Sequence, residues 1–155
     1  MCKYLLGVWK RNLEWREFGL DFNHLRSSSS VVEIQETKGA AAETGTRFLD
    51  WFFGMDPQDL KVGYSMQFFP AREGEDTPIE WIYKGRVCRG DFNPSSAMLT
   101  LNFRDKSGLV TNASYRAVDD NTMAVCLVET DARHTPVIQY GLMIRLAKGS
   151  EMPQG

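Results

Sequence analysis

The second half of this 155-residue chain alternates apolar and polar residues with a period of two, and this pattern constrains the fold most. The alternation runs through five segments: 79–92, 97–104, 109–118, 121–130 and 137–147. Short runs rich in Asn, Asp, Ser, Gly and Pro separate most of them, as hairpin turns do. Alternation over roughly four to eight residues is typical of a strand with one buried face. The second half is therefore predicted to be an antiparallel meander of five strands.

The first half of the chain is less regular. Strand-like runs cover 4–18, with a bend or break near Arg11, and then 30–37 and 63–69. The segment 46–53 fits two structures, because its aromatic residues match both helical spacing and one face of a strand. We favour a short helix or wide turn there, since a glycine follows as a helix-ending residue.

Strands that follow one another in this way would leave long edges if the sheet stayed open. Closure into a barrel removes those edges, and about eight to ten strands enclose packed side chains or one small ligand. We therefore predict an all-β fold, an antiparallel meander closed into a barrel of about eight to ten strands with one or two short helices. One domain is expected over 1–148, followed by a flexible tail over 149–155, which is polar and contains a proline.

Charge and composition exclude several classes of function. Eighteen basic and twenty acidic residues give a formal net charge of −2, which argues against a nucleic-acid partner. No apolar stretch approaches the roughly 20 residues of a membrane span. The apolar run Tyr4–Trp9 is too short for a signal peptide, so we expect a cytoplasmic protein. Of three widely spaced cysteines, Cys88 and Cys126 lie in apolar, strand-like runs, which suggests a pair of buried free thiols in a reducing compartment.

The opening of the first strand carries the one family resemblance in the chain. Gly7-Val8-Trp9 resembles the Gly-x-Trp signature of the calycin superfamily, which includes the lipocalins and the fatty-acid-binding proteins. The resemblance implies a lipocalin-like barrel whose closed end is plugged by Trp9. It also implies that an arginine of the last strand packs across the indole, and Arg145 is the counterpart here. A guanidinium can stack on an indole face while it donates to backbone carbonyls.

Metal and cofactor sites have little support in the sequence. His24 and His134 are the only histidines and lie far apart, and no Cys/His cluster has the spacing of metal ligands. Glycine-rich phosphate loops are absent as well. We therefore expect no metal and no cofactor.

Aromatic residues on successive strands give the main functional clue. In a small barrel some of them point inward, where they line either a packed core or the wall of a ligand cavity. Within the run 79–92, Arg89 has the same parity as Trp81 and Tyr83, which predicts a charged anchor for a ligand on the same strand face as these two rings. The candidate ligand-binding residues are Trp51, Tyr64, Phe68, Trp81, Tyr83, Arg89, Phe103 and Tyr115.

Two residues are candidates for acid or base chemistry. Glu129 shares a strand face with Met123, Val125 and Leu127, and a carboxylate inside an apolar barrel has a raised pKa. Alternatively, Glu129 simply marks the strand end, where it meets water. His134 lies in a predicted loop, which places it either at the barrel mouth or in solvent.

Three hypotheses for function follow. The first is a carrier or chaperone of an apolar or aromatic small molecule. The second is a cofactor-free isomerase, cyclase or chromophore lyase that uses Glu129 or His134. One motif does not fit a bilin lyase: such lyases of this superfamily have Arg-Thr-x-His after the first-strand Trp, and this chain has Arg11-Asn12-Leu13-Glu14 there. The third is a partner surface around the aromatic run 51–53. No membrane partner is expected, and a homodimer is left open.

Overall fold

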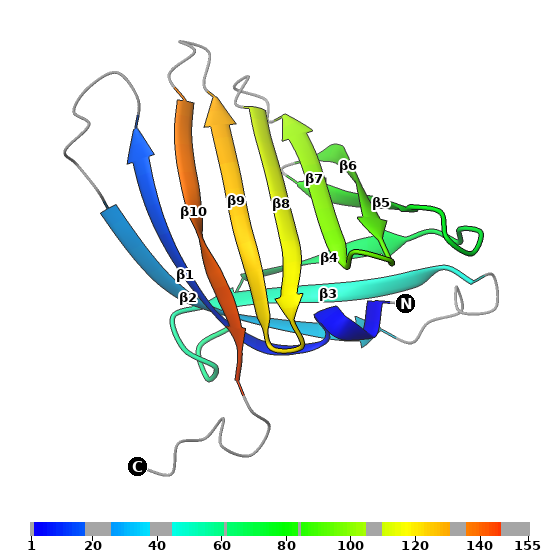
Figure 1. The fold of residues 1–155 in the computed structure, drawn as a ribbon, viewed down its shortest axis with the longest axis horizontal. Helices are drawn as coiled ribbons and strands as arrows, with labels where there is room; N and C mark the ends of the chain where they lie inside the picture. Colours follow the sequence, from blue (N-terminus) through cyan, green and yellow to red (C-terminus); the bar gives the residue numbers. More distant parts are fainter. Residues whose placement is uncertain are drawn as a thin grey trace.

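The computed structural model describes residues 2–17, 26–37, 45–60, 62–83, 85–104, 110–130 and 136–146. Within them, ten strands form one closed antiparallel barrel in which each strand pairs with the next, and β1 pairs with β10 (Figure 1). A 3-10 helix, η1 (Cys2–Leu5), precedes the barrel. The strands are β1 (Gly7–Glu17), β2 (Arg26–Thr37), β3 (Arg47–Gly54), β4 (Val62–Phe68), β5 (Thr77–Tyr83), β6 (Arg86–Asn93), β7 (Met98–Arg104), β8 (Val110–Asp119), β9 (Thr122–Thr130) and β10 (Pro136–Arg145). The predicted all-β barrel is confirmed.

The predicted five-strand meander is wrong in one place. The run 79–92 contains two strands, because β5 and β6 form a tight hairpin in which Tyr83 pairs with Arg86. Gly85 lies in this turn with a positive φ of 77°, a conformation that glycine adopts without strain. The second half of the chain therefore supplies six strands, and the inward-facing parity changes between β5 and β6.

The predicted helix or wide turn over 46–53 is also wrong, because this segment forms β3. Leu49 and Trp51 are buried while their neighbours are less so, which is the period of a strand. Pairing with β2 on one side and β4 on the other satisfies the backbone hydrogen bonds on both edges of β3.

The bend expected near Arg11 is absent, since β1 runs unbroken and pairs along its length with β2 and β10.

The barrel has two different ends. At the closed end, η1 lies beside the hairpin that joins β8 and β9 (Figure 1), and the inward-facing residues Trp9, Met123 and Met143 are fully buried. The open end is where β1 and β9 finish and β10 begins. Inward-facing side chains there, such as Leu127 and Gln139, remain partly exposed. Solvent therefore reaches the inner wall from the open end.

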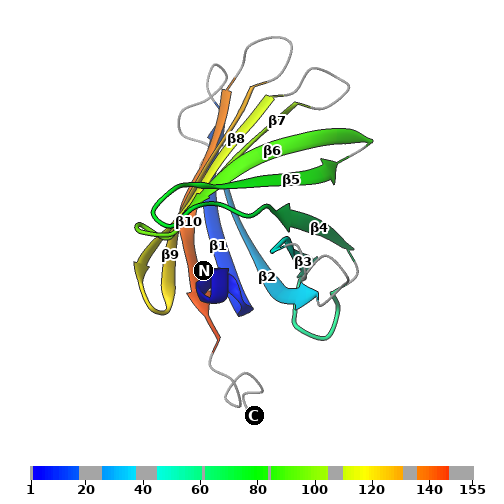
Figure 2. The same cartoon turned by 90° about the vertical axis from the view of Figure 1, so that its right-hand side faces the viewer.

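Two strands separate toward the open end. The hydrogen-bonded register of β4 with β5 covers only 66–68 and 79–81, although both strands continue beyond it. Figure 2 shows β4 and β5 diverging past this short paired stretch.

Among the described residues, no helix is both long and apolar enough to cross a membrane. The tail expected over 149–155 lies outside the described residues.

Candidate ligand site in the open half of the barrel

The closed end is built around the Gly-x-Trp motif. The Arg145 guanidinium carbon lies 4.1 Å from the centre of the Trp9 ring, close enough for a cation–π contact. The same guanidinium donates from Nη1 to the carbonyl oxygen of Leu6 and from Nη2 to that of Tyr4, both at 2.6 Å. The Trp9 Nε1–H donates to the carbonyl oxygen of Leu5 at 2.9 Å. Every polar group of this plug therefore has a partner.

Gly7 explains why the motif begins with glycine. Its φ is +126°, a region that residues with a side chain rarely adopt, and a Cβ there would lie 3.1 Å from Nη1 of Arg145. Tyr4 completes the plug, because its ring packs 5.7 Å from the Trp9 ring and its hydroxyl donates to the carbonyl oxygen of Thr122 at 2.9 Å. Burial raises the pKa of the Tyr4 hydroxyl, and the nearby Arg145 charge opposes that shift.

A cluster of rings lines the other half of the interior. Trp51 and Phe53 on β3 stack at 6.3 Å, and Phe53 stacks in turn on Tyr64 of β4 at 5.4 Å. Trp51 also meets Tyr115 of β8 edge to face at 6.0 Å, so rings from three strands form one continuous wall. The sequence named three of these four residues as ligand-binding candidates. The fourth, Phe53, follows from its parity with Trp51 once the segment is known to be a strand.

The other four aromatic candidates lie either deeper in the core or outside what the structure describes. Phe68 is buried and packs edge to face against Phe92 at 6.3 Å. Trp81 is buried beside Cys88 across the β5–β6 pair. The structure therefore places both in the packed core. The side chains of Tyr83 and Phe103 lie outside the described residues.

Arg11 is an interior residue that the sequence reasoning missed. It has the inward parity of Trp9 and Leu13, and its guanidinium lies 5.3 Å from the centre of the Phe53 ring. Its Nε donates to the Ser30 hydroxyl at 3.3 Å and its Nη1 to the Tyr115 hydroxyl at 3.4 Å. No described acidic residue forms an ion pair with it. The barrel interior therefore holds a partly buried positive charge that only neutral groups solvate.

Trp51 carries a buried donor without an acceptor. Its side chain is 1% exposed, and its Nε1–H makes no hydrogen bond to any described residue. A buried donor that finds no acceptor costs about 1–3 kcal/mol, so such groups are rare in folded proteins. Because Trp51 faces inward beside Tyr115, this unsatisfied donor belongs to the barrel interior.

Glu129 faces inward near the open end. It pairs with Thr111 of β8 and Val137 of β10 and is partly exposed. It makes no hydrogen bond or ion pair with another described residue, so its carboxylate is accessible to a molecule that enters the barrel. His134, the other acid–base candidate, lies outside the described residues, as does His24.

Two sequence predictions about this region are wrong. Arg89 does not share the inner face with Trp81, because the β5–β6 hairpin shifts the parity; it lies on the outer wall with its side chain 78% exposed and pairs there with Glu80 at 3.3 Å. The aromatic run 51–53 is not an exposed patch either, since Trp51 faces the interior and is buried. Among the described residues, no group of three or more His, Cys, Asp or Glu side chains is placed to hold a metal ion.

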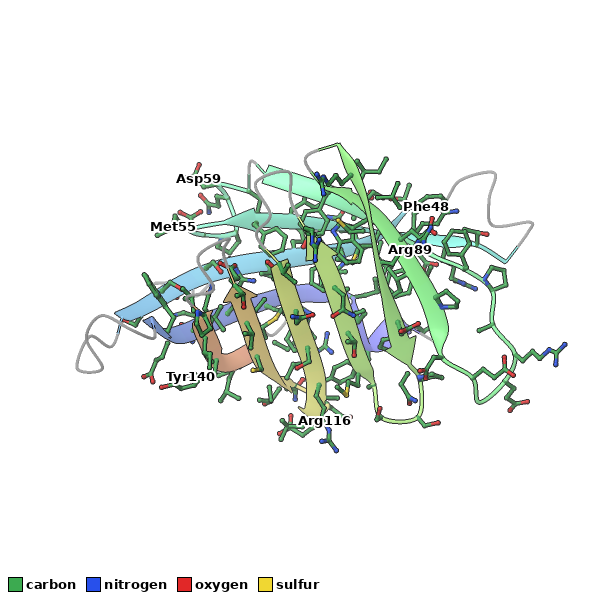
Figure 3. All side chains as sticks on the ribbon, turned by 90° about the horizontal axis from the view of Figure 1, so that it is seen from above. Phe48, Met55, Asp59, Arg89, Arg116 and Tyr140 are labelled. Atoms are coloured by element: carbon green, nitrogen blue, oxygen red, sulfur yellow. The ribbon has the colours of Figure 1, made fainter. Side chains whose placement is uncertain are left out.

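A groove of about 600 Å³ crosses the outer wall over β2, β1 and β10. It is lined by exposed apolar side chains such as Leu142 and Ile144, and Figure 3 shows Tyr140 of the same strand on the outer side of the barrel. Two polar groups in its lining bond to each other, since the Ser29 hydroxyl donates to Oδ1 of Asn12 at 2.9 Å. The buried donor that has no described acceptor, Nε1–H of Trp51, lies inside the barrel, which makes the interior the stronger candidate site.

Comparisons with known proteins support the fold. No protein-family model matches the chain, and no curated protein matches it. Among solved structures, the S-type phycobiliprotein lyase CPES from Guillardia theta superposes with a TM-score of 0.68 over 94% of this chain and 90% of that chain. The two sequences are 8% identical, so the likeness concerns the fold alone. Together with the closed ten-strand barrel, it confirms the calycin-like architecture that Gly7-x-Trp9 suggested.

Proposed function

We propose that the protein binds an apolar or aromatic small molecule in the open half of its barrel, as a carrier or chaperone of that ligand. One observation carries the proposal: several inward-facing side chains of this half, among them Arg11 and Leu127, stay partly exposed, whereas inward-facing side chains at the closed end such as Trp9 are fully buried. The partly exposed group includes the stacked rings of Phe53 and Tyr64. An apolar wall with a few convergent polar groups is the usual form of a small-molecule site. A cytoplasmic location and the lack of a nucleic-acid partner stay predictions from the sequence.

Thermal unfolding with a panel of ligands tests the carrier function. Oleic acid, retinol, biliverdin and protoporphyrin IX present different chain and ring shapes, and native mass spectrometry shows which are retained. Binding at a concentration about 100-fold above Kd stabilises the folded state by about 2.7 kcal/mol, a shift in Tm of several degrees. We expect at least one probe to bind and to raise Tm.

A pair of variants on neighbouring strands locates the bound probe. Leu127→Arg places a long charged side chain on the inner wall of the open half and is expected to abolish binding. Val118→Arg places the same side chain on the outer face, where Val118 is 62% exposed, and is expected to leave binding unchanged. Equal loss in both variants, or no retained probe and no Tm shift with the wild type, contradicts the proposal.

A second candidate function is that of a chromophore lyase on the same barrel. The observation that favours it is the superposition on a phycobiliprotein lyase over nearly the whole chain. In this reading the barrel holds the chromophore, and Glu129, inward-facing and without a described partner, exchanges a proton with it. Positioning by the ring wall and one acid–base group then supply the catalysis.

Transfer of a tetrapyrrole chromophore to an apo-phycobiliprotein tests this second candidate. Covalent fluorescence of the acceptor after denaturing electrophoresis reports the reaction. Glu129→Gln keeps the size of the side chain and is expected to slow transfer about 10²-fold or more, as the loss of a general acid or base does. Glu14→Gln on the outer wall is the control and is expected to leave the rate unchanged. No transfer by the wild type removes the lyase role while the carrier role stands, and equal rates for both variants remove the acid–base role of Glu129.

A further inference from the structure

Three side chains that carry hydrogen-bond donors, each from a different strand, lie next to one another inside the barrel. Arg11 comes from β1, Trp51 from β3 and Tyr115 from β8. The ring of Trp51 lies 6.0 Å from that of Tyr115, and Nη1 of Arg11 lies 3.4 Å from the Tyr115 hydroxyl oxygen. The three side chains therefore form one group, although far apart in sequence.

Each member of this group has an unused N–H or O–H. Nη2 of Arg11 makes no hydrogen bond to a described residue, and Nε1–H of Trp51 makes none either. The Tyr115 hydroxyl oxygen accepts from Arg11, so its own hydrogen is free to donate elsewhere. Within the described residues the group thus offers three donors, one formal positive charge and no carboxylate.

The chemistry of such a group favours one kind of partner. Tryptophan N–H and arginine N–H groups donate only, so a molecule that satisfies them must present acceptors. A carboxylate presents two oxygens with several lone pairs, and it also neutralises the guanidinium charge. Apolar rings surround the group, which weakens competition from water and strengthens such a charge-assisted bond.

Resting on the proposed carrier function, we propose that the ligand carries a carboxylate and that Arg11, Trp51 and Tyr115 bind it inside the barrel. The acid end of the molecule enters first and the apolar remainder extends along Phe53 and Tyr64 toward the open end. The Trp51 donor, which has no acceptor among the described residues, obtains one from the carboxylate.

A matched pair of fluorescent probes tests the proposal. 11-(Dansylamino)undecanoic acid and its methyl ester differ only in the carboxylate, and each is titrated into the protein at pH 7. The wild type is expected to bind the acid at least about 10-fold more tightly than the ester. Arg11→Met is expected to reduce that preference to less than about twofold, mainly by weakening binding of the acid.

Further variants separate the three donors from a general effect of charge. Trp51→Phe and Tyr115→Phe each remove one donor and keep a ring, and each is expected to lower the preference about threefold. Arg11→Lys keeps the charge and is expected to retain part of the preference. The control is Arg116→Met, which removes a positive charge from the outer wall, where Figure 3 shows the Arg116 side chain pointing away from the barrel.

The outcomes distinguish this proposal from the carrier function. Binding of acid and ester with equal affinity by the wild type overturns the carboxylate site and leaves the carrier function standing. An unchanged preference in Arg11→Met also overturns it, as does an equal loss in Arg116→Met, which indicates a long-range effect of net charge. Failure of both probes to bind counts against both proposals. Near-ultraviolet circular dichroism of each variant verifies that its rings remain packed.

Discussion

The barrel contains two groups that each include an arginine and a tryptophan, one at the closed end and one in the open half, and they differ in how many of their donors have described acceptors. At the closed end, Arg145 and Trp9 donate to backbone carbonyls and the guanidinium covers the indole. In the open half, Arg11 donates to two hydroxyls and to no other described group, and the Trp51 indole N–H has no acceptor among the described residues. The same residue types therefore stabilise the fold at one end and leave unmet hydrogen-bonding capacity at the other. Hydrogen-bond donors left without acceptors, in a fold whose other local features agree with one another, are typical of a functional site.

The largest difference is expected when the two arginines are replaced by methionine. Arg145→Met leaves two or more carbonyls of the plug without their donor and removes the cation–π contact, at a cost of about 2–3 kcal/mol. Arg11→Met removes a partly buried charge that has no carboxylate partner among the described residues, so the free energy of unfolding is expected to change by less than about 1 kcal/mol. Denaturant unfolding at pH 7 measures both values. Equal destabilisation by the two substitutions contradicts the contrast between the ends.

A smaller difference is expected between the two tryptophans. Trp9→Phe and Trp51→Phe remove the same atoms from side chains of nearly equal burial. Both lose packing volume, but only Trp9→Phe also leaves a buried carbonyl, that of Leu5, without its donor. We expect Trp9→Phe to be the more destabilising by about 1–2 kcal/mol. The two unfolding curves, measured side by side, decide this, and a larger loss for Trp51→Phe runs against the account.

The smallest effect concerns pH and is confined to the closed end. Burial raises the pKa of Tyr4 in the folded protein above its ordinary value of 10.0. Above about pH 10 the unfolded chain then loses the Tyr4 proton more readily than the folded chain, so stability falls as the pH rises. We expect the free energy of unfolding to decrease between pH 10 and 11 with a slope that Tyr4→Phe reduces. An identical slope in the variant shows that other groups cause the decrease.

The sequence carries much of the fold because barrel strands alternate over a long stretch. Gly7 and Trp9 mark the start of β1, and the late arginine supplies their partner. The turn at Gly85 was missed because the apolar and polar residues on either side of it still look like one continuous alternation. After the turn, even-numbered residues face inward instead of odd-numbered ones. Arg89 was assigned to the wrong face for that reason. Gly85 was the one local signal, because a tight hairpin turn needs a residue that adopts a positive φ without strain.

The candidate site was only partly predictable. Trp51, Tyr64 and Tyr115 were named because aromatic residues in a small barrel must often face inward. Arg11 was missed, because a break was expected at this position, although Trp9 and Leu13 have the same parity and place it inside. The convergence of Arg11 with Tyr115 depends on barrel closure between strands 104 residues apart, which no local pattern encodes.

The most direct test of the central claim follows the indole N–H signals of the four tryptophans by nuclear magnetic resonance. Trp9→Phe and Trp51→Phe assign the two signals, and 11-(dansylamino)undecanoic acid is then titrated into the labelled wild type. The account predicts that the Trp51 signal shifts as its N–H acquires an acceptor, while the Trp9 signal, already hydrogen-bonded at the closed end, stays in place. A Trp9 shift with an unmoved Trp51 signal, or two unmoved signals at saturating probe, contradicts it.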